Sequence, residues 1–249
     1  FPDDYRMDPF DPTLSGKMHM LDRLLKQVKA TGDRIVVVSN FTSILNQVES
    51  LCQLRDYTWV RLDGSTASDK RMQIVESYNN PNSKNFVFLL SSKAGGAGLN
   101  IIGANRLVLF DPDWNPSNDL QAMARVWRDG QKKSVFIYRF VTTGTIEEKI
   151  FQRQIVKTGL SKTVVDEKTT KAAFSKDMLK KLFNFRSDYP ICETFAQEAE
   201  HGDNVDKVED VDPVLYKSID GHDIVTFVKI QDEKDDNKLL LDVSEDGSS

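Results

Sequence analysis

Long apolar runs are missing from this sequence, and cysteine is scarce. No stretch of about 18 apolar residues occurs among the 249 residues, so we expect no membrane-spanning segment. The acidic start Phe1-Pro2-Asp3-Asp4 has no apolar segment typical of a secretory signal. Cys52 and Cys192 are too few for a disulfide framework and fit a reducing compartment.

Two common phosphate-binding patterns are also incomplete. A Walker A loop reads G-x-x-x-x-G-K-[ST], but Gly16-Lys17 has Asp11 at the first glycine position and Met18 at the hydroxyl position. A dinucleotide fingerprint begins at Gly96 and Gly98 but has Ile101 where its third glycine belongs. An Asp-Glu-x-His box is absent too. A complete nucleotide site of either kind is therefore not expected.

Acidic and basic residues are unevenly distributed along the chain. The net charge is −5, yet residues 193–249 hold 17 acidic and 5 basic residues. The preceding residues hold the other 21 acidic and 28 basic residues, so this part is basic overall. A basic body permits binding to a polyanion, whereas an acidic tail is most often solvated and poorly ordered.

Apolar periodicity alternates between helix and strand along most of the chain. Helical spacing occurs at 18–30, 42–54, 68–78, 118–128 and after Thr145, which opens a capping box with Glu148. Short apolar runs at 35–38, 59–62, 86–90, 107–110 and 135–141 indicate buried strands. This alternation predicts an α/β fold, with a parallel sheet covered by helices on both faces.

The same patterns divide the chain into four parts. We expect a linker over 1–14, the α/β lobe over 15–145, a helical extension over 146–192 and an acidic tail over 193–249. Helical signal continues through 151–160 and returns at 176–185. Residues 224–228 fit either a strand or a partner-binding segment, and the sequence does not decide between them.

A glycine-rich loop follows the third expected strand, at residues 91–100. Ligands bind beyond the carboxyl ends of strands in open parallel sheets. Glycines let backbone N–H groups approach a phosphate, and Lys93 adds positive charge. The alternative is a glycine-rich turn that binds no ligand.

The expected helix at 118–128 carries Gln121, Arg125 and Arg128 at i, i+4 and i+7, which places them on one helical face. The planar guanidinium groups suit a phosphate supplied from across a cleft. The alternative is an ordinary solvated helix face.

These motifs together resemble a known family. The element Asp111-Pro112-Asp113-Trp114-Asn115-Pro116 precedes Gln121-Ala122-x-x-Arg125-x-x-Arg128-x-Gly130-Gln131. This arrangement is similar to the second RecA-like lobe of SWI/SNF-type ATPases of helicase superfamily two, over about residues 14–165. The stretches 127–133 and 144–154 resemble the recombination-repair branch, the Rad-fifty-four branch, more than nucleosome remodellers.

The resemblance implies an ATP-dependent translocase of double-stranded DNA that acts in the nucleus with a strand-exchange recombinase. It places Arg125 and Arg128 as ATP-facing arginines, with Gln121 beside them. It also implies that Gly96 and Gly98 couple DNA contact to the nucleotide and that residues 146–157 brace the two lobes. The implied contacts with the DNA backbone are Ser39, Asn40, Ser65, Thr66, Ser92 and Lys93.

The resemblance also implies what this chain does not supply. The Mg²⁺ ligands and the base that activates water would lie on a first RecA-like lobe, so the isolated chain should be inactive as an ATPase. No metal site is expected in this chain, because Cys192 and His201 have no CxxC partner.

Several alternatives remain open. The isolated lobe could be a non-enzymatic DNA-binding or protein-docking module, and a nucleosome remodeller or RNA helicase lobe would share much of the pattern. Ser65 and Thr66 could be a helix-entry cap, and Asp63-Gly64 a simple turn. Asp111 and Asp113 fit a structural role slightly better than a catalytic one.

Overall fold

The computed structural model describes residues 10–94, 98–163, 226–231 and 239–242. The expected helical segment at 176–185, the second cysteine and most of the acidic tail lie outside these residues.

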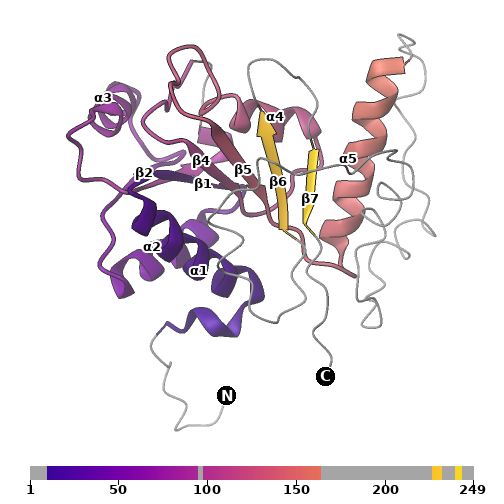
Figure 1. Cartoon of the computed structure of the whole chain (residues 1–249), viewed down its shortest axis with the longest axis horizontal. Coiled ribbons are helices and arrows are strands. Elements are labelled where there is room, and N and C mark those ends of the chain that lie inside the picture. The colour runs from indigo at the N-terminus through magenta and orange to yellow at the C-terminus, as the bar shows by residue number, and fades with distance from the viewer. Residues whose placement is uncertain (1–9, 95–97, 164–225, 232–238, 243–249) are drawn as a thin grey trace, which may run out of the picture.

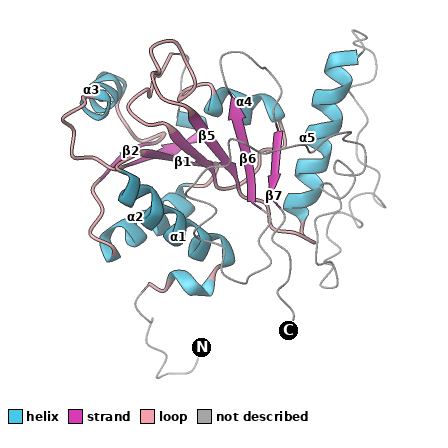
Figure 2. Cartoon of the chain, in the orientation of Figure 1, coloured by secondary structure: helices cyan, strands magenta, loops and turns pink. Residues whose placement is uncertain are grey.

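The centre of the fold is a five-stranded parallel sheet. Its strands are β1 (Ile35–Ser39), β2 (Trp59–Leu62), β3 (Val87–Ser91), β4 (Arg106–Leu109) and β5 (Val135–Arg139), in the order β2-β3-β1-β4-β5. Register is continuous, with Val37 opposite both Leu89 and Val108. The expected α/β fold with a RecA-like parallel sheet is confirmed, and Figure 2 shows the helices placed around the sheet.

Helices cover both faces of this sheet. They are α1 (Gly16–Thr31), α2 (Thr42–Leu54), α3 (Ser68–Asn79), α4 (Pro116–Met123) and α5 (Ile146–Thr163), with 3-10 turns η1 (Pro12–Leu14) and η2 (Ser92–Ala94). Alternate residues of a strand point to opposite faces. Ile35 and Val37 accordingly pack with α1 and α2, whereas Val36 and Val38 pack with α3 and α4. The resulting two apolar cores explain why the strands read as continuous apolar runs.

The sheet is extended by two antiparallel strands from the acidic segment. Strand β6 (Thr226–Gln231) pairs with β5, and β7 (Leu239–Asp242) pairs with β6. Figure 1 shows both, in yellow, beside β5. Residues 224–228 fit either a strand or a partner-binding segment by sequence, and residues 226–228 lie in β6. The backbone groups of these two apolar stretches are paired in the sheet.

Helix α4 is shorter than the sequence pattern indicates. It ends at Met123, and the following residues form tighter turns, in which Arg125 N donates to the Ala122 carbonyl and Val126 N to the Met123 carbonyl. These turns bury Val126 in the core. The expectation that Gln121, Arg125 and Arg128 share one helical face is therefore wrong, because the helix stops before both arginines.

The start of α5 agrees with the expected capping box in a modified form. Thr145 Oγ1 accepts from Glu147 N at 3.2 Å, and Glu148 Oε2 accepts from Gly144 N at 2.8 Å. Both bonds are displaced by one residue from the usual pairing, but they still satisfy backbone donors at the helix entrance.

Candidate functional site

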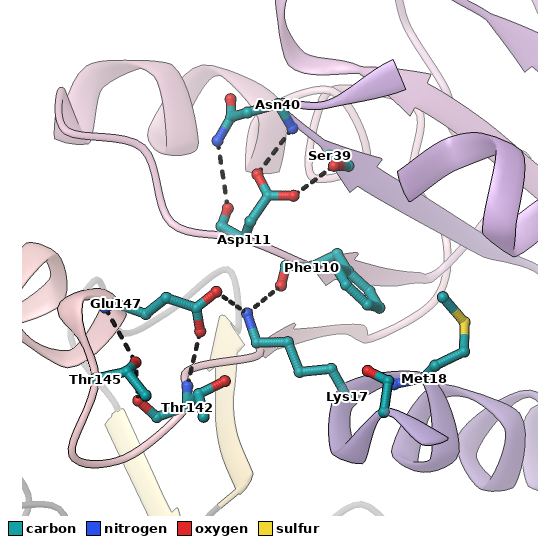
Figure 3. Close-up of polar contacts among 10 residues, drawn as sticks. Lys17, Met18, Ser39, Asn40, Phe110, Asp111, Thr142, Thr145 and Glu147 are labelled. Carbon is teal, nitrogen blue, oxygen red and sulfur yellow. Dashed lines mark hydrogen bonds and ion pairs between the residues drawn. The ribbon is translucent and has the colours of Figure 1, made fainter. Parts of the chain in front are cut away.

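The carboxyl ends of β1 and β4 meet at the side chain of Asp111. Its Oδ1 accepts from the backbone N of Asn40 at 2.8 Å, and its Oδ2 accepts from the hydroxyl of Ser39 (Figure 3). Burial raises the pKa of Asp111, while these hydrogen bonds and the charge of Lys17 act in the opposite direction. Asp111 therefore joins two strand ends, which is a structural role.

Asn40 extends the network to the end of β3. Its side-chain Oδ1 accepts from the hydroxyl of Ser92, and its Nδ2 lies 3.5 Å from the Asp111 carbonyl. The structure thus brings together Ser39, Asn40 and Ser92, three residues expected at DNA. Ser39, however, is only 1% exposed, and its hydroxyl donates within the network. Its position fits support of the neighbouring loop better than direct contact with DNA.

The loop after β2 is organised by Asp63. Both the backbone N and the hydroxyl of Ser65 donate to Asp63 Oδ1, at 2.9 and 2.5 Å, and Thr66 Oγ1 accepts from Asp63 N at 3.1 Å. The hydroxyl bond from Ser65 is the main reason that the pKa of Asp63 is lowered. Residue Ala67 precedes α3, so Ser65 and Thr66 form a turn around Asp63 and do not cap the helix.

Arg71 connects this turn to the glycine-rich loop. Its Nε donates to the Thr66 carbonyl at 2.9 Å, and its NH1 donates to the Ala94 carbonyl at 2.8 Å. Lys93 lies in the same loop and is exposed. Gly96 is outside the described residues, but Gly98 has a φ of 109°, a conformation that favours glycine.

The residue that follows the glycine-rich loop contacts the turn that carries Arg125 and Arg128. Ile101 N donates to the Arg125 carbonyl at 2.8 Å. Arg125 is 8% exposed, whereas Arg128 and Gln121 are exposed. Burial, followed by the nearby charge of Arg128, lowers the pKa of Arg125. The planar guanidinium groups of both residues are chemically suited to an anionic ligand such as a polyphosphate.

The sequence did not reveal the contacts that hold the start of α5 near the carboxyl ends of β4 and β5. Lys17 Nζ donates to Glu147 Oε1 at 2.6 Å and to the Phe110 carbonyl at 2.7 Å, while Glu147 Oε2 accepts from Thr142 N at 2.9 Å (Figure 3). Burial lowers the pKa of Lys17, and the Glu147 carboxylate opposes this effect. Gly16-Lys17 is therefore the start of α1, with its lysine used in an ion pair.

A second group of contacts is made further along α5, at Gln154. It joins Gln154 to Asp113 and Asp119 and to Arg139 at the end of β5. The available signal was the apolar spacing of 146–155, in which buried Glu148 and Gln154 occupy core-facing positions. Polar residues at such positions need partners, but the spacing does not say which.

In the part of the chain that the structure describes, no group of three or more His, Cys, Asp or Glu side chains is arranged to hold a metal ion. No helix of the described segments is both long and apolar enough to cross a membrane.

Comparisons with known proteins agree with this architecture. Residues 16–130 match the helicase conserved C-terminal domain. The chain is 58% identical over 186 residues to the DNA repair protein rhp54 of Schizosaccharomyces pombe and to the DNA repair and recombination protein RAD54-like of Gallus gallus. These matches cover 74% of this chain but 22% and 25% of the relatives, so the chain spans about a quarter of their length.

A similar solved structure is the C-terminal part of the Fun30 ATPase domain. It matches with a TM-score of 0.57 and 29% identity, over 79% of this chain and 57% of that one.

Proposed function

The chain carries a helicase C-terminal domain of the RAD54 type within the SWI/SNF family, and from this premise we propose that it is the second lobe of an ATP-driven motor on double-stranded DNA. The relatives are named for DNA repair and recombination. We infer a role in homologous-recombination repair in the nucleus, together with a strand-exchange recombinase.

One observation carries this proposal. The segment from Ser92 to Ile101 begins in the polar network at the strand ends and finishes hydrogen-bonded to the turn that holds Arg125. A single short segment therefore connects the surface proposed for DNA with the arginines proposed for ATP. A motor needs such a connection, because binding at one site must change the position of groups at the other.

At the DNA surface, Asn40, Thr66, Ser92 and Lys93 are the proposed contacts. Their loops lie at one edge of the sheet and are tied together through Asp111 and Arg71. Ser65 and Ser39 are proposed to support these loops, because their hydroxyl hydrogens are donated to carboxylates. Contacts to phosphates position a protein on DNA without reading its sequence.

At the nucleotide surface, Arg128 is exposed, whereas Arg125, three residues earlier, is buried. We propose that they bind the phosphates of ATP held by a first lobe, with Gln121 beside them. ATP supplies the phosphoryl group, and Mg²⁺ would be held by residues of that first lobe. Guanidinium groups in this position stabilise charge that develops on the transferred phosphoryl group.

The enzymatic part of the proposal is tested by comparing the complete protein with this chain alone. Steady-state ATP hydrolysis should be stimulated by duplex DNA in the complete protein and be negligible for the chain alone. A complete protein without DNA-stimulated hydrolysis would refute the motor assignment and favour a docking module. Equal turnover by this chain alone would show that it contains a full site.

The DNA part is tested with two unrelated duplexes titrated at several salt concentrations. Affinity should be the same for both and should fall steeply with salt. Lys93→Ala should reduce the slope of log K against log salt by about one. Lys84→Ala is the matched control, because exposed Lys84 precedes β3 whereas Lys93 follows it. A strong preference for one duplex, or equal slopes for both variants, would contradict the proposed surface.

A further inference from the structure

We propose that Gln154 is a positioning residue. Through it, α5 holds the loop 111–116 and α4 in the orientation that the turn carrying Arg125 and Arg128 requires. The inference rests on the proposed function of that turn. Gln154 lies within α5 and is only 2% exposed. Its amide nitrogen donates to Asp119 Oδ2 at 2.7 Å and also to the Asp113 carbonyl.

The amide of Gln154 has a partner on each side. Its Oε1 accepts from Arg139 NH1 at 3.4 Å, so the same side chain contacts β5 as well as α4. The other Asp119 oxygen accepts from Asp113 N at 3.3 Å. Glutamine suits this place because one amide group offers two donors and an acceptor without adding a charge.

The groups around Gln154 are charged and removed from water. Burial raises the pKa of Asp119, and the hydrogen bond from Gln154 is the largest opposing effect. Burial also lowers the pKa of Arg139, against which the Asp119 carboxylate acts. A buried charge is stable only while its hydrogen-bonding partners remain in place. Without the Gln154 donors, the Asp119 carboxylate is therefore expected to move toward other partners or toward water.

A second residue of α5 contacts the same loop. Lys157, three positions after Gln154, has its Nζ 3.4 Å from the Trp114 carbonyl. Residues three apart lie on one face of a helix. One face of α5 thus contacts two successive carbonyl groups of the loop, those of Asp113 and Trp114.

The loop leads directly to the arginines. Asp119 lies in the first turn of α4, and Arg139 NH2 donates to Met123 Sδ, at the last residue of that helix, over 3.6 Å. Arg125 is two residues further on. Both ends of α4 are therefore held by groups that Gln154 contacts directly or through Arg139. A displacement of about 1 Å at a catalytic group can lower a rate by about 100-fold.

The test uses Gln154→Leu in the complete protein, which keeps the size of the side chain and removes its hydrogen bonds. Gln152→Leu is the matched control, because Gln152 is the same residue type on the same helix and is only half-buried. DNA-stimulated kcat should fall at least about tenfold with Gln154→Leu, and the concentrations of ATP and DNA at half-saturation should change less than about twofold.

Hydrogen exchange provides a second measurement, which does not depend on catalysis. Hydrogen exchange of the amides at 113–120 should become faster in Gln154→Leu, while the amides of β1 and β3 remain protected. This result distinguishes loosening of the loop from general unfolding. The exchange result can also be obtained if the wild-type protein shows no ATPase activity. In that case the proposed function would be refuted, but the positioning role of Gln154 would still be supported.

The exchanged pair Gln154→Glu with Asp119→Asn completes the design. The amide introduced at position 119 can donate to the carboxylate introduced at position 154, so the double variant should recover part of the rate and protection that Gln154→Glu alone loses. Rates and exchange at 113–120 in Gln154→Leu that match those of Gln152→Leu would overturn the proposal. Uniformly faster exchange throughout the sheet would also overturn it, because Gln154 would then be a general stability residue.

Discussion

At the scale of single residues, Asp33 shows how charge is used at the amino-terminal end of the sheet. It accepts from Arg106 Nε at 3.0 Å and from Lys133 Nζ at 2.8 Å. Arg106 is buried, and its Cζ lies 4.5 Å from the centroid of the Phe136 ring. Burial by itself would raise the pKa of Asp33, but hydrogen bonds from Lys133, Asn105 and Arg106 outweigh it, and the pKa is lowered.

We therefore expect Asp33→Asn to destabilise the fold at neutral pH by about 3 kcal/mol, because the charge of Arg106 stays buried without its partner. A lowered pKa in the folded state gives a stabilisation that is present above the ordinary value of 3.8 and is lost as pH falls through the folded value. The difference from wild type should narrow on acidification. Urea denaturation at pH 7 and near pH 3.5 measures it, with exposed Asp129→Asn as the control. A difference that is constant with pH would contradict this account.

Gly103 is required by close packing against the end of α3. A Cβ at this position would lie 2.8 Å from the Tyr78 carbonyl oxygen and 2.9 Å from Asn79 Cα, both of them backbone atoms. Gly103 N also donates to Asn79 Oδ1 at 2.8 Å. This contact fixes the loop that continues from the glycine-rich segment into β4.

Gly103→Ala should lower the free energy of unfolding by about 1–3 kcal/mol, because backbone must move to admit the methyl group. Gly64→Ala is the matched control, since a Cβ there has no heavy atom within 4 Å. Thermal melting of both variants decides the matter, and equal melting temperatures would show that the loop adjusts freely.

The roles of individual polar residues were the part least accessible to the sequence. Ser39, Ser65 and Ser92 each follow an expected strand in the sequence, and nothing there distinguishes their roles. In the structure, the Ser39 hydroxyl donates to Asp111 and the Ser65 hydroxyl donates to Asp63. Ser92 instead reaches Asn40 from the neighbouring loop. Which hydroxyl remains available to a phosphate depends on hydrogen-bond geometry between segments far apart in sequence. The predicted nucleotide and DNA contacts accordingly stay predictions.

At the scale of elements, apolar periodicity was sufficient for the five parallel strands and for α1 to α3. It failed at α4, where the pattern continued to 128 but the helix ends at Met123. Beyond Met123 the chain forms turns that keep Val126 buried in the core. The carbonyl of Arg125 accepts a hydrogen bond from Ile101 N. Periodicity reports which residues are buried, and it does not distinguish a helix from successive turns that bury the same residues.

The ion pair between α1 and α5 is a contact between elements that can be tested directly. Lys17→Met and Glu147→Gln should each lower the free energy of unfolding by about 1–2 kcal/mol, because each removes the ion-pair partner of a partly buried charged group. The double variant should cost less than the two single changes together, by about 1 kcal/mol. Urea denaturation of the three variants measures this coupling. Lys26→Met, at an exposed position of α1, is the control, and strictly additive effects would contradict a direct Lys17–Glu147 interaction.

At the scale of the whole molecule, strand order explains why distant motifs converge. The order β2-β3-β1-β4-β5 places the loops containing Thr66, Ser92, Asn40 and Asp111 at one edge of the sheet. The sequence predicted a parallel sheet with ligands at this edge, because parallel strands share one carboxyl end. It could not predict that α5 would hold the edge through Lys17 and Gln154, since these contacts depend on how α5 docks.

Arg128 gives the most direct test of the motor assignment. It is exposed, so its replacement should leave the fold intact, whereas replacement of the 8% exposed Arg125 would combine effects on folding and function. Lysine preserves the positive charge but not the planar fork of donors that fits a phosphate. Arg23→Lys on α1, which packs on the opposite face of the sheet from α4, is the matched control.

The decisive measurement is steady-state ATP hydrolysis by the complete protein with saturating duplex DNA, for wild type, Arg128→Lys and Arg23→Lys. Melting temperatures and DNA affinities of the three proteins should agree closely. The account predicts that Arg128→Lys loses at least about 100-fold in kcat, since an arginine finger contributes roughly 10³–10⁵, and that Arg23→Lys retains the wild-type rate. Hydrolysis by Arg128→Lys within about twofold of wild type would show that this arginine belongs to an ordinary surface turn, and the ATP-facing role of the turn would be contradicted.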